Sequence, residues 1–465
     1  MRTHLLALAA TLTLTTFSGA AWATGMQGHI YMAQCGAELS QNPRVKQIVA
    51  AHPMMLANGG ILPDSGYATS DYDQGEIPHW EEYVEGFIEQ LRERHGGADA
   101  PESWANVAVL FGLSAHGITD STFDTLFFPR VEQEDRPEDI DLAADVLYVA
   151  LTGKKFIPDV VLDTAFASDV FQNKISHDVT KDEISSAMKT ARSGIGATVL
   201  IAKSPGFYEK NYPWERRSLL DPRVPGAYAF GSRVVTRYYD ELLRRLDGNT
   251  SADGAVIGTY PTDGYPMAAL RKGRPDARVL FYFGIGIERE SLDGVLRVTG
   301  PDGAEIPGKV GTFRGDKWAN VLQFVPDNDW TPATTYTVQL KNTFRTLQGT
   351  SPSAPLEFTF TTCAPDPATG ECPEPQGAPP PSPCPLTDKI GVEVDEGEAG
   401  AGGDSGTGGD AGGAQAGSTP QPAAPQAAAS GDEGGCSASG RGSSLGGAAA
   451  GLAAALLFRP RRRRR

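Results

Sequence analysis

The chain has 465 residues and a net charge of −16, from 41 Lys and Arg against 57 Asp and Glu. This length is too great for one ordinary hydrophobic core, so we expect two folded domains and extended tails. We find no P-loop, dinucleotide-binding fingerprint or basic and aromatic stripe, and nucleic acid is therefore not an expected partner.

Residues 1–23 have the pattern of a secretory signal peptide. An early Arg2 precedes a short apolar run, and the small residues Ala20, Ala21 and Ala23 suit a signal peptidase. The run is too short to cross a bilayer of about 30 Å, and the alternative is a buried N-terminal helix. Export would place the cysteines in an oxidising compartment.

An oxidising compartment permits disulfides among the five cysteines. Cys35 is expected to be a free thiol in the core. Two of Cys363, Cys372 and Cys384 could pair and leave one over, but the sequence does not say which.

Residues 24–247 are expected to form an all-α domain. The segment from His79 to His95 places Tyr83, Phe87 and Leu91 on one apolar stripe, as in a surface helix. Further helices are expected after Pro101 and in two other segments: Lys181–Lys203 and Ala229–Leu246.

A Gly- and Pro-rich connection at residues 248–273 precedes a change of periodicity from 3.6 to 2. Five strands are predicted, at Val279–Ile287, Val295–Val298, Val321–Val325, Tyr336–Leu340 and Leu356–Thr361. They indicate a small all-β sandwich over residues 274–362. Its ending, TPATTYTVQLKN followed by LEFTFTT, resembles the bacterial Ig-like modules of surface-layer and secreted proteins, which implies a spacer or adhesion role.

Residues 363–435 are expected to be a disordered acidic linker, because they contain hardly any large apolar residue that could form a core. Between Asp388 and Glu433 nine acids face the single Lys389, which accounts for about half of the net charge. Residues 436–465 resemble the C-terminal sorting tails of myxobacterial surface proteins, with Cys436, an apolar stretch and a final Arg cluster. The resemblance implies a processed anchor at the outer cell surface; the alternative is a disordered basic tail.

The candidate chemistry lies in the helical domain. His116, Asp120 and Asp124 have the spacing i, i+4 and i+8, so we expect them on one face of an apolar helix. Nitrogen and oxygen ligands that converge in this way suit a divalent cation. Asp64 in LPDSGY and His79 in IPHW, each of which could instead be a cap or a core residue, join His29 as candidate ligands.

The ordered set TG-x-x-GH, LPD-x-GY, IPHW and AHG-x-x-D-x-x-x-D resembles the zinc-dependent phospholipase C family. It is most similar to the N-terminal domain of glycosylphosphatidylinositol-specific phospholipase D, and the single-strand-specific zinc nucleases share the scaffold. The resemblance covers residues 24–247. It implies a metallohydrolase domain with at least two bound Zn²⁺ ions.

The ligands that this resemblance implies are matched position by position. Asp64, His79, His116 and Asp120 would hold one zinc. Asp120 would also bridge to a second zinc, which His29 and the free amine and carbonyl of Thr24 would complete after cleavage at Ala23.

A third site departs from the family's pattern. Asp124, Asp141 and Asp145 stand where the family has histidines and an acid. The site is therefore either lost or rebuilt from oxygen ligands, which favour Mg²⁺ or Ca²⁺ over zinc.

We therefore expect a secreted, monomeric zinc-dependent phosphodiesterase that acts on a phospholipid or a glycosylated inositol lipid at a membrane surface. Paired metal ions would activate water, with Asp64 as the general base. The alternatives are a single-strand nuclease on the same scaffold and a surface binding protein with a vestigial metal site.

Overall fold

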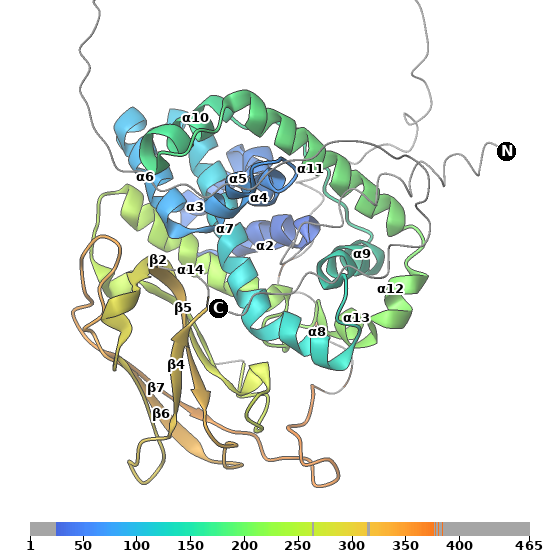
Figure 1. Cartoon of the computed structure of the whole chain (residues 1–465), viewed down its shortest axis with the longest axis vertical. Coiled ribbons are helices and arrows are strands. Elements are labelled where there is room, and N and C mark those ends of the chain that lie inside the picture. The colour runs from blue at the N-terminus through green and yellow to red at the C-terminus, as the bar shows by residue number, and fades with distance from the viewer. Residues whose placement is uncertain are drawn as a thin grey trace, which may run out of the picture. The chain divides into compact units, whose positions relative to one another are not determined.

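The computed structural model describes residues 25–262, 265–313 and 317–375, together with Gly377, Pro380 and Cys384. Helices occupy the chain as far as Leu246 and strands follow (Figure 1). The expected change from a helical region to a small antiparallel β-region is thus confirmed. The expected signal peptide at 1–23, most of the linker at 363–435 and the tail at 436–465 lie outside the described residues.

The longer helices of the helical region are α2 Met26–Leu39, α3 Pro43–Ala51, α4 Pro53–Gly66, α6 Glu81–His95, α7 Trp104–Thr122, α9 Ile140–Thr152, α11 Lys181–Ile201 and α14 Tyr228–Leu246. Shorter helices connect them: α5 Tyr72–Glu76, η1 Ile77–His79, α8 Phe128–Glu134, α10 Thr164–Val170, α12 Gly206–Asn211 and α13 Pro213–Ser218. None of the described helices is both long enough and apolar enough to cross a bilayer.

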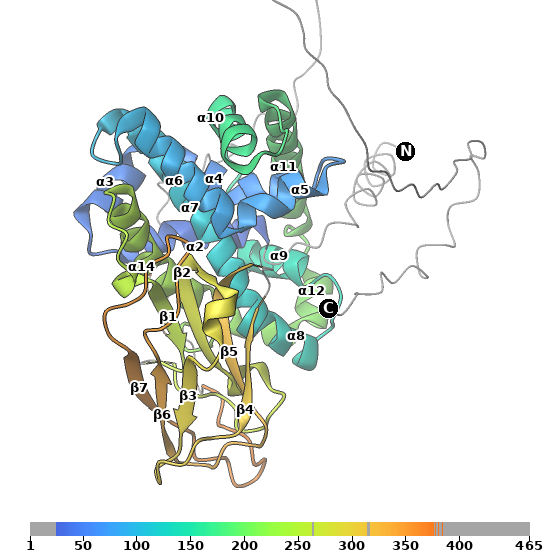
Figure 2. The ribbon, with the colours of Figure 1, turned by 60° about the vertical axis from the view of Figure 1, so that its left-hand side comes forward.

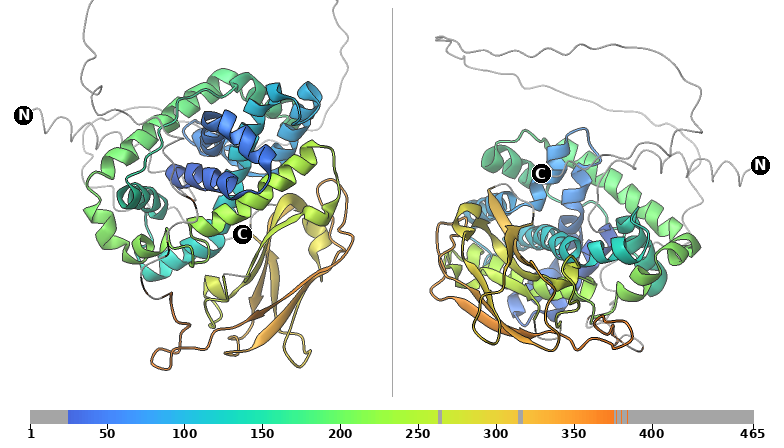
Figure 3. Two further views of the ribbon diagram at one scale, coloured as in Figure 1. Left: turned by 180° about the vertical axis from the view of Figure 1, so that it is seen from behind. Right: turned by 60° about the horizontal axis from the view of Figure 1, so that its bottom comes forward.

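Helix α7 lies at the centre of the helical region. It is buried almost all round from Val107 to Thr122, as its apolar sequence requires, and it packs against α2, α4 and α14. Seen from behind, α14 runs beside α2 and borders the strands (Figure 3).

Two glycines allow α4 and α7 to approach closely. A Cβ atom at Gly59 would lie 2.1 Å from the carbonyl oxygen of Val109, and one at Gly112 would lie 2.0 Å from that of Leu56. Only glycine fits at such a crossing. This crossing brings the end of α4, with Asp64, beside the end of α7.

The end of α7 differs from the continuous helix that the sequence predicts. After Thr122 the chain forms a π-helix, η3 Phe123–Phe127, before α8 begins. A π-turn holds more residues than an α-turn, so the rotation per residue after Thr122 differs from that of the predicted α-helix. Asp124 lies in this π-helix.

The β-region contains a four-stranded and a three-stranded sheet, both antiparallel, in the orders β1-β2-β5-β4 and β3-β6-β7. The strands are β1 Val256–Tyr260, β2 Val279–Glu288, β3 Leu296–Thr299, β4 Gly308–Thr312, β5 Trp318–Pro326, β6 Thr335–Leu340 and β7 Leu356–Thr361. Tyr336 lies opposite Phe360 and Val338 opposite Phe358, in line with the predicted alternation. Figure 2 shows β1 and β2 next to α14.

Strands β1 and β4 were not predicted. β1 lies inside residues 248–273, which the sequence indicates as a connection, so the sheet begins before residue 274. β4 contains two glycines and one large apolar side chain, and in β1 Gly258 interrupts a short apolar run, so each gives a weak period-2 signal.

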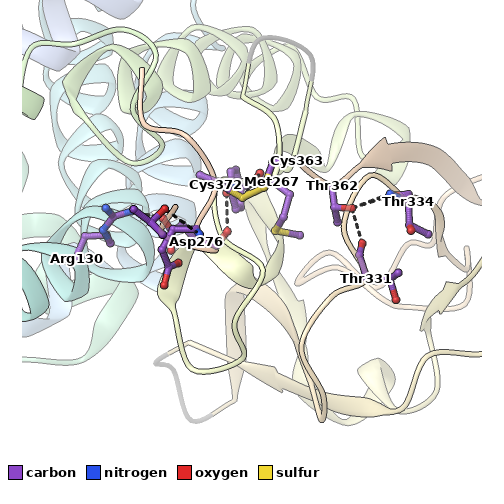
Figure 4. Close-up of a disulfide and its surroundings, with 12 residues drawn as sticks. Arg130, Met267, Asp276, Thr331, Thr334, Thr362, Cys363 and Cys372 are labelled. Atoms are coloured by element: carbon purple, nitrogen blue, oxygen red, sulfur yellow. Dashed lines mark hydrogen bonds and ion pairs between the residues drawn. A yellow bond between two sulfur atoms is a disulfide. The ribbon is translucent and has the colours of Figure 1, made fainter. Parts of the chain in front are cut away.

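Two disulfides close the described part of the chain. Cys363 pairs with Cys372, next to Met267 and the ion pair of Arg130 with Asp276 (Figure 4). Cys35 pairs with Cys384, 349 residues away. The expectation of a free thiol at Cys35 is therefore wrong, because a segment that has no packing signal of its own returns to α2.

Candidate metal centre

Five side chains from four elements converge at the end of α7. His29 comes from α2, Asp64 from α4 and His79 from η1, and the last two are His116 and Asp120 of α7. They form two overlapping groups that share His116. His29, His116 and Asp120 make one group, and Asp64, His79 and His116 make the other; in each, one ligand atom per residue lies within 4.8 Å of the others.

The distances inside the cluster are short and involve the same atom of each imidazole. His29 Nε2 lies 3.2 Å from Asp120 Oδ1, and His116 Nε2 lies 3.4 Å from Asp120 Oδ2. His79 Nε2 lies 3.5 Å from Asp64 Oδ1 and from Asp120 Oδ2. The Nε2 atoms of His79 and His116 are 3.0 Å apart. All three Nε2 atoms therefore face one centre.

The other ring nitrogen of each histidine is fixed from outside the cluster. His79 Nδ1 donates to the carbonyl oxygen of Gly75 at 2.8 Å, and His116 Nδ1 donates to that of Gly60 at 2.7 Å. His29 Nδ1 donates to Thr119 Oγ1 at 2.9 Å, since the proton of that hydroxyl is already given to the carbonyl oxygen of His116. A proton on Nδ1 leaves a lone pair on Nε2 in the neutral ring.

This protonation pattern determines what the centre can hold. Lone pairs on nitrogen face carboxylate oxygens and one another, and such contacts are unfavourable unless a positive charge lies among them. Both oxygens of Asp64, one oxygen of Asp120 and Nε2 of His29 are buried and lack a hydrogen-bond partner within the described part of the chain. The residues therefore fit a divalent cation held by nitrogen and oxygen ligands.

The electrostatics of the cluster follow from burial and from mutual contact. Burial raises the pKa of Asp64, but His116 and His79 outweigh it and lower the pKa to about 2. The pKa of Asp120 is held well below its usual value, since His29 and His116 outweigh burial in the same way. Burial lowers the pKa of His116, but Asp64 and Asp120 raise it to about 10, so in the absence of a cation a proton on this ring supplies the positive charge that the carboxylates require. Burial, helped by His116, lowers the pKa of His29.

The other expected ligands are placed differently. Asp124 lies in the π-helix that follows α7 and belongs to neither group. Asp141 lies half-buried in the first turn of α9 with an unpartnered Oδ1, and its pKa is raised by burial and by the nearby Asp124 and Asp120. Thr24 lies outside the described residues.

Asp145, a further candidate for the third site, accepts hydrogen bonds from backbone amides instead. Its oxygens accept hydrogen bonds from the amides of Gln27 and Gly28, each at 3.1 Å. These are free donors at the start of α2, where Gly25 supplies no side-chain cap. Asp145 therefore positions the helix that carries His29.

Sequence reasoning missed the anchoring groups on Gly60, Gly75 and Thr119. Thr119 could have been found from its place three residues after His116, but a backbone carbonyl carries no sequence signal. A third group, Asp71, Asp73 and His177, lies at the surface, where His177 Nε2 and Asp71 Oδ2 already pair at 2.8 Å.

Comparison with known proteins concerns the β-region. The family model for the bacterial Ig-like domain matches residues 253–362. The β-region is similar to these domains. The expected resemblance is thus confirmed, and the match begins 21 residues before the predicted boundary at 274. No curated protein matches the chain.

Two solved structures of the bacterial S-layer protein SbsC align with parts of the chain, at low sequence identity and with low TM-scores. One has 8% identity and a TM-score of 0.20, over 61% of this chain and 46% of that one. The N-terminal part of SbsC has 9% identity and a TM-score of 0.18, over 68% of this chain and 79% of that one. The chain thus spans about half of the first structure, and TM-scores this low do not indicate a shared fold.

Proposed function

We propose that the protein is an exported, zinc-dependent phosphodiesterase whose metal site is built from His29, Asp64, His79, His116 and Asp120. The observation that carries the proposal is the set of three imidazoles with Nδ1 fixed outward and Nε2 directed at unpartnered carboxylate oxygens. Two overlapping groups that share His116, with Asp120 in contact with histidines of both, suit a pair of ions. Mixed imidazole and carboxylate ligands favour zinc.

Each residue has a part in the chemistry. Zinc bound here would lower the pKa of a nearby water molecule, and its positive charge would stabilise the phosphoryl oxygens. Asp64 Oδ2 is buried and unpartnered, and it would accept the proton of the attacking water. Gly60, Gly75 and Thr119 would keep the histidine rings in the tautomer that binds metal.

The phosphodiester class of substrate, and within it a phospholipid or glycosylated inositol lipid, rests on the resemblance of the four ordered motifs. The third ion expected by that resemblance would have Asp124 and Asp141 as oxygen ligands, because Asp145 is already hydrogen-bonded to two backbone amides of α2. Mg²⁺ or Ca²⁺ would suit such ligands better than zinc.

Export is supported by the cysteines. Two disulfides, Cys35–Cys384 and Cys363–Cys372, persist in an oxidising compartment and are rare in the cytosol. We therefore propose a secreted protein that the C-terminal tail anchors at the outer cell surface.

A surface binding protein is the second candidate. The match of residues 253–362 to the bacterial Ig-like domain favours it, because the domain has no chemistry of its own and the third metal site lacks histidines.

Metal analysis and an assay on the same sample distinguish the candidates. The purified mature protein should contain at least two zinc ions per chain, and it should hydrolyse a phosphorylcholine ester. Asp120→Asn should lose both, because Asp120 Oδ1 faces His29 of one group and Oδ2 faces His79 of the other. A protein without zinc would support the binding role, and cleavage of single-stranded DNA but not of lipid would support a nuclease.

A further inference from the structure

Strand β2 is buried on both of its faces, from Val279 to Ile287. On one face, Phe281 contacts Phe358 and Phe283 contacts Phe344, both within the β-region. On the other face lie Tyr282, Gly284 and Gly286. A sheet whose outer face is free alternates buried with exposed positions, so this strand has a second packing contact.

The second contact is with the helical region. Tyr282 OH lies 2.8 Å from Thr125 Oγ1, in the π-helix that continues α7 beyond Asp120. A Cβ atom at Gly284 would lie 3.1 Å from Tyr238 Cδ2 of α14. One at Gly286 would lie 3.2 Å from Glu81 Cβ, at the start of α6. The two glycines thus let the strand lie directly against the helices.

A buried charge network joins these contacts to His79. Glu81, two residues after His79, accepts hydrogen bonds from Tyr238 OH and, at 3.1 Å, from Arg245 Nη1. The same Nη1 donates to the carbonyl oxygen of Gly284 at 2.7 Å. Arg245 also pairs with Glu85, one turn further along α6. One guanidinium therefore connects α6, α14 and β2.

Strand β5 also borders the helical region, near His79. A small cavity of about 10 Å³ is lined by His79, Ser114 and Ser121 from the helical region and by Asn320 from β5. The β-region therefore borders the segment that carries His79 as well as the one that carries Asp120.

We propose that the β-region is a positioning element of the metal centre, which holds His79 through Arg245 and Glu81 and holds Asp120 through Tyr282 and Thr125. The inference rests on the proposed function for its metal readout, but the contacts themselves do not. It replaces the spacer role expected for the β-region. A ligand's support can matter as much as the ligand, since loss of such partners typically lowers metal affinity by about 10- to 100-fold.

Gly286→Ala in the full chain tests the proposal, because the added methyl group would press on Glu81 Cβ at 3.2 Å as well as on Trp318 Cβ of β5 at 3.1 Å. The matched control is Val338→Ala, which weakens the core of the β-region at a fully buried position of β6. Two quantities are measured well below the melting temperature of each variant. They are the zinc dissociation constant, by competition with a chromophoric chelator, and amide hydrogen exchange of residues 77–85 in metal-free protein.

Gly286→Ala should raise the zinc dissociation constant about tenfold or more, and exchange at residues 77–85 should be about tenfold faster. Val338→Ala should lower the melting temperature and leave both quantities within about twofold. The same small response in both variants would overturn the proposal. If the unsubstituted protein binds no zinc, the proposed function fails, and the exchange measurement still decides the positioning role.

Tyr282→Phe provides a second variant that adds no bulk, should Gly286→Ala fail to fold. It removes only the hydrogen bond to Thr125. Exchange should rise at residues 120–127 and remain unchanged at residues 335–340 of β6. Unchanged exchange at residues 120–127 would contradict the proposal.

Discussion

Asp145 is the clearest case of a single residue whose role depends on its surroundings. It lies buried on α9, and its carboxylate receives two backbone amides of α2, the helix that carries His29. Burial raises its pKa to about 7, because the hydrogen bonds from Gln27 and Gly28 offset only part of the cost of removing the charge from water.

This pKa predicts a pH dependence of stability. The ordinary value is 3.8, so between about pH 4 and 7 the folded state binds more protons than the unfolded state. The contribution is therefore present below about pH 4 and is lost as the pH rises through 7. A shift of this size corresponds to at most about 4 kcal/mol.

Asp145→Asn should remove this part of the dependence. Urea unfolding of metal-free protein at pH 4 and at pH 7.5 measures it in both proteins, with all other titrating groups in common. The variant should lose a few kcal/mol less between the two pH values than the unsubstituted protein. An equal loss in both would show that the pKa of Asp145 in the folded state lies near its ordinary value of 3.8.

At the scale of elements, the crossing of α4 and α7 determines the geometry of the centre. The chain can make it only because Gly59 and Gly112 leave the two backbones in contact. Asp64 follows Gly59 on α4, and His116 follows Gly112 on α7. Any separation of these helices therefore moves an aspartate away from a histidine.

Gly112→Ala should destabilise the protein by about 3 kcal/mol or more, since its Cβ atom would lie 2.0 Å from a backbone oxygen that cannot rotate away. It should also weaken zinc binding. The control is Gly196→Ala at a half-buried position of α11, where nothing lies within 4 Å of the added atom. That change should stabilise the helix by up to about 1 kcal/mol. Unfolding in urea measures both, and equal effects would contradict the close-packing argument.

Elements also differ in how well their sequences predicted them. Helix α11 begins at Lys181 as expected, where Thr180 and Glu183 form a capping box. Strand β6 has the predicted alternation of buried and exposed side chains, and β7 has it from Phe358 onward, whereas Leu356 is exposed. The π-turn after Thr122 has no comparable pattern, and Asp124 lies in it, outside the group of His116 and Asp120.

For the described part of the molecule as a whole, the disulfide between Cys35 and Cys384 closes the longest loop. It connects α2 to a residue that follows the whole β-region. The Cys363–Cys372 disulfide spans only nine residues. In the chain-entropy account, a longer loop restricts the unfolded state more.

Replacing both Cys35 and Cys384 by alanine should therefore cost more stability than replacing both Cys363 and Cys372. The difference in loop length corresponds to about 3 kcal/mol. Guanidinium unfolding of the two double variants measures it. Equal losses would indicate residual structure in the unfolded chain or an enthalpic origin for the stabilisation.

Much of this protein follows from its sequence alone. The change of period near residue 250 predicts helices followed by an Ig-like β-region, and spacing and ordered motifs single out His29, Asp64, His79, His116 and Asp120. Local patterns suffice there because side-chain periodicity and motif residues are properties of short segments.

Only the tertiary structure decided the rest. It paired Cys35 with Cys384, turned Asp145 toward the amides of α2 and laid β2 against α14 and Glu81. Each of these contacts joins residues that are far apart in the chain, and glycines and backbone carbonyls make many of them. Such groups leave no periodic trace in a sequence, because their partners are determined by packing rather than by spacing.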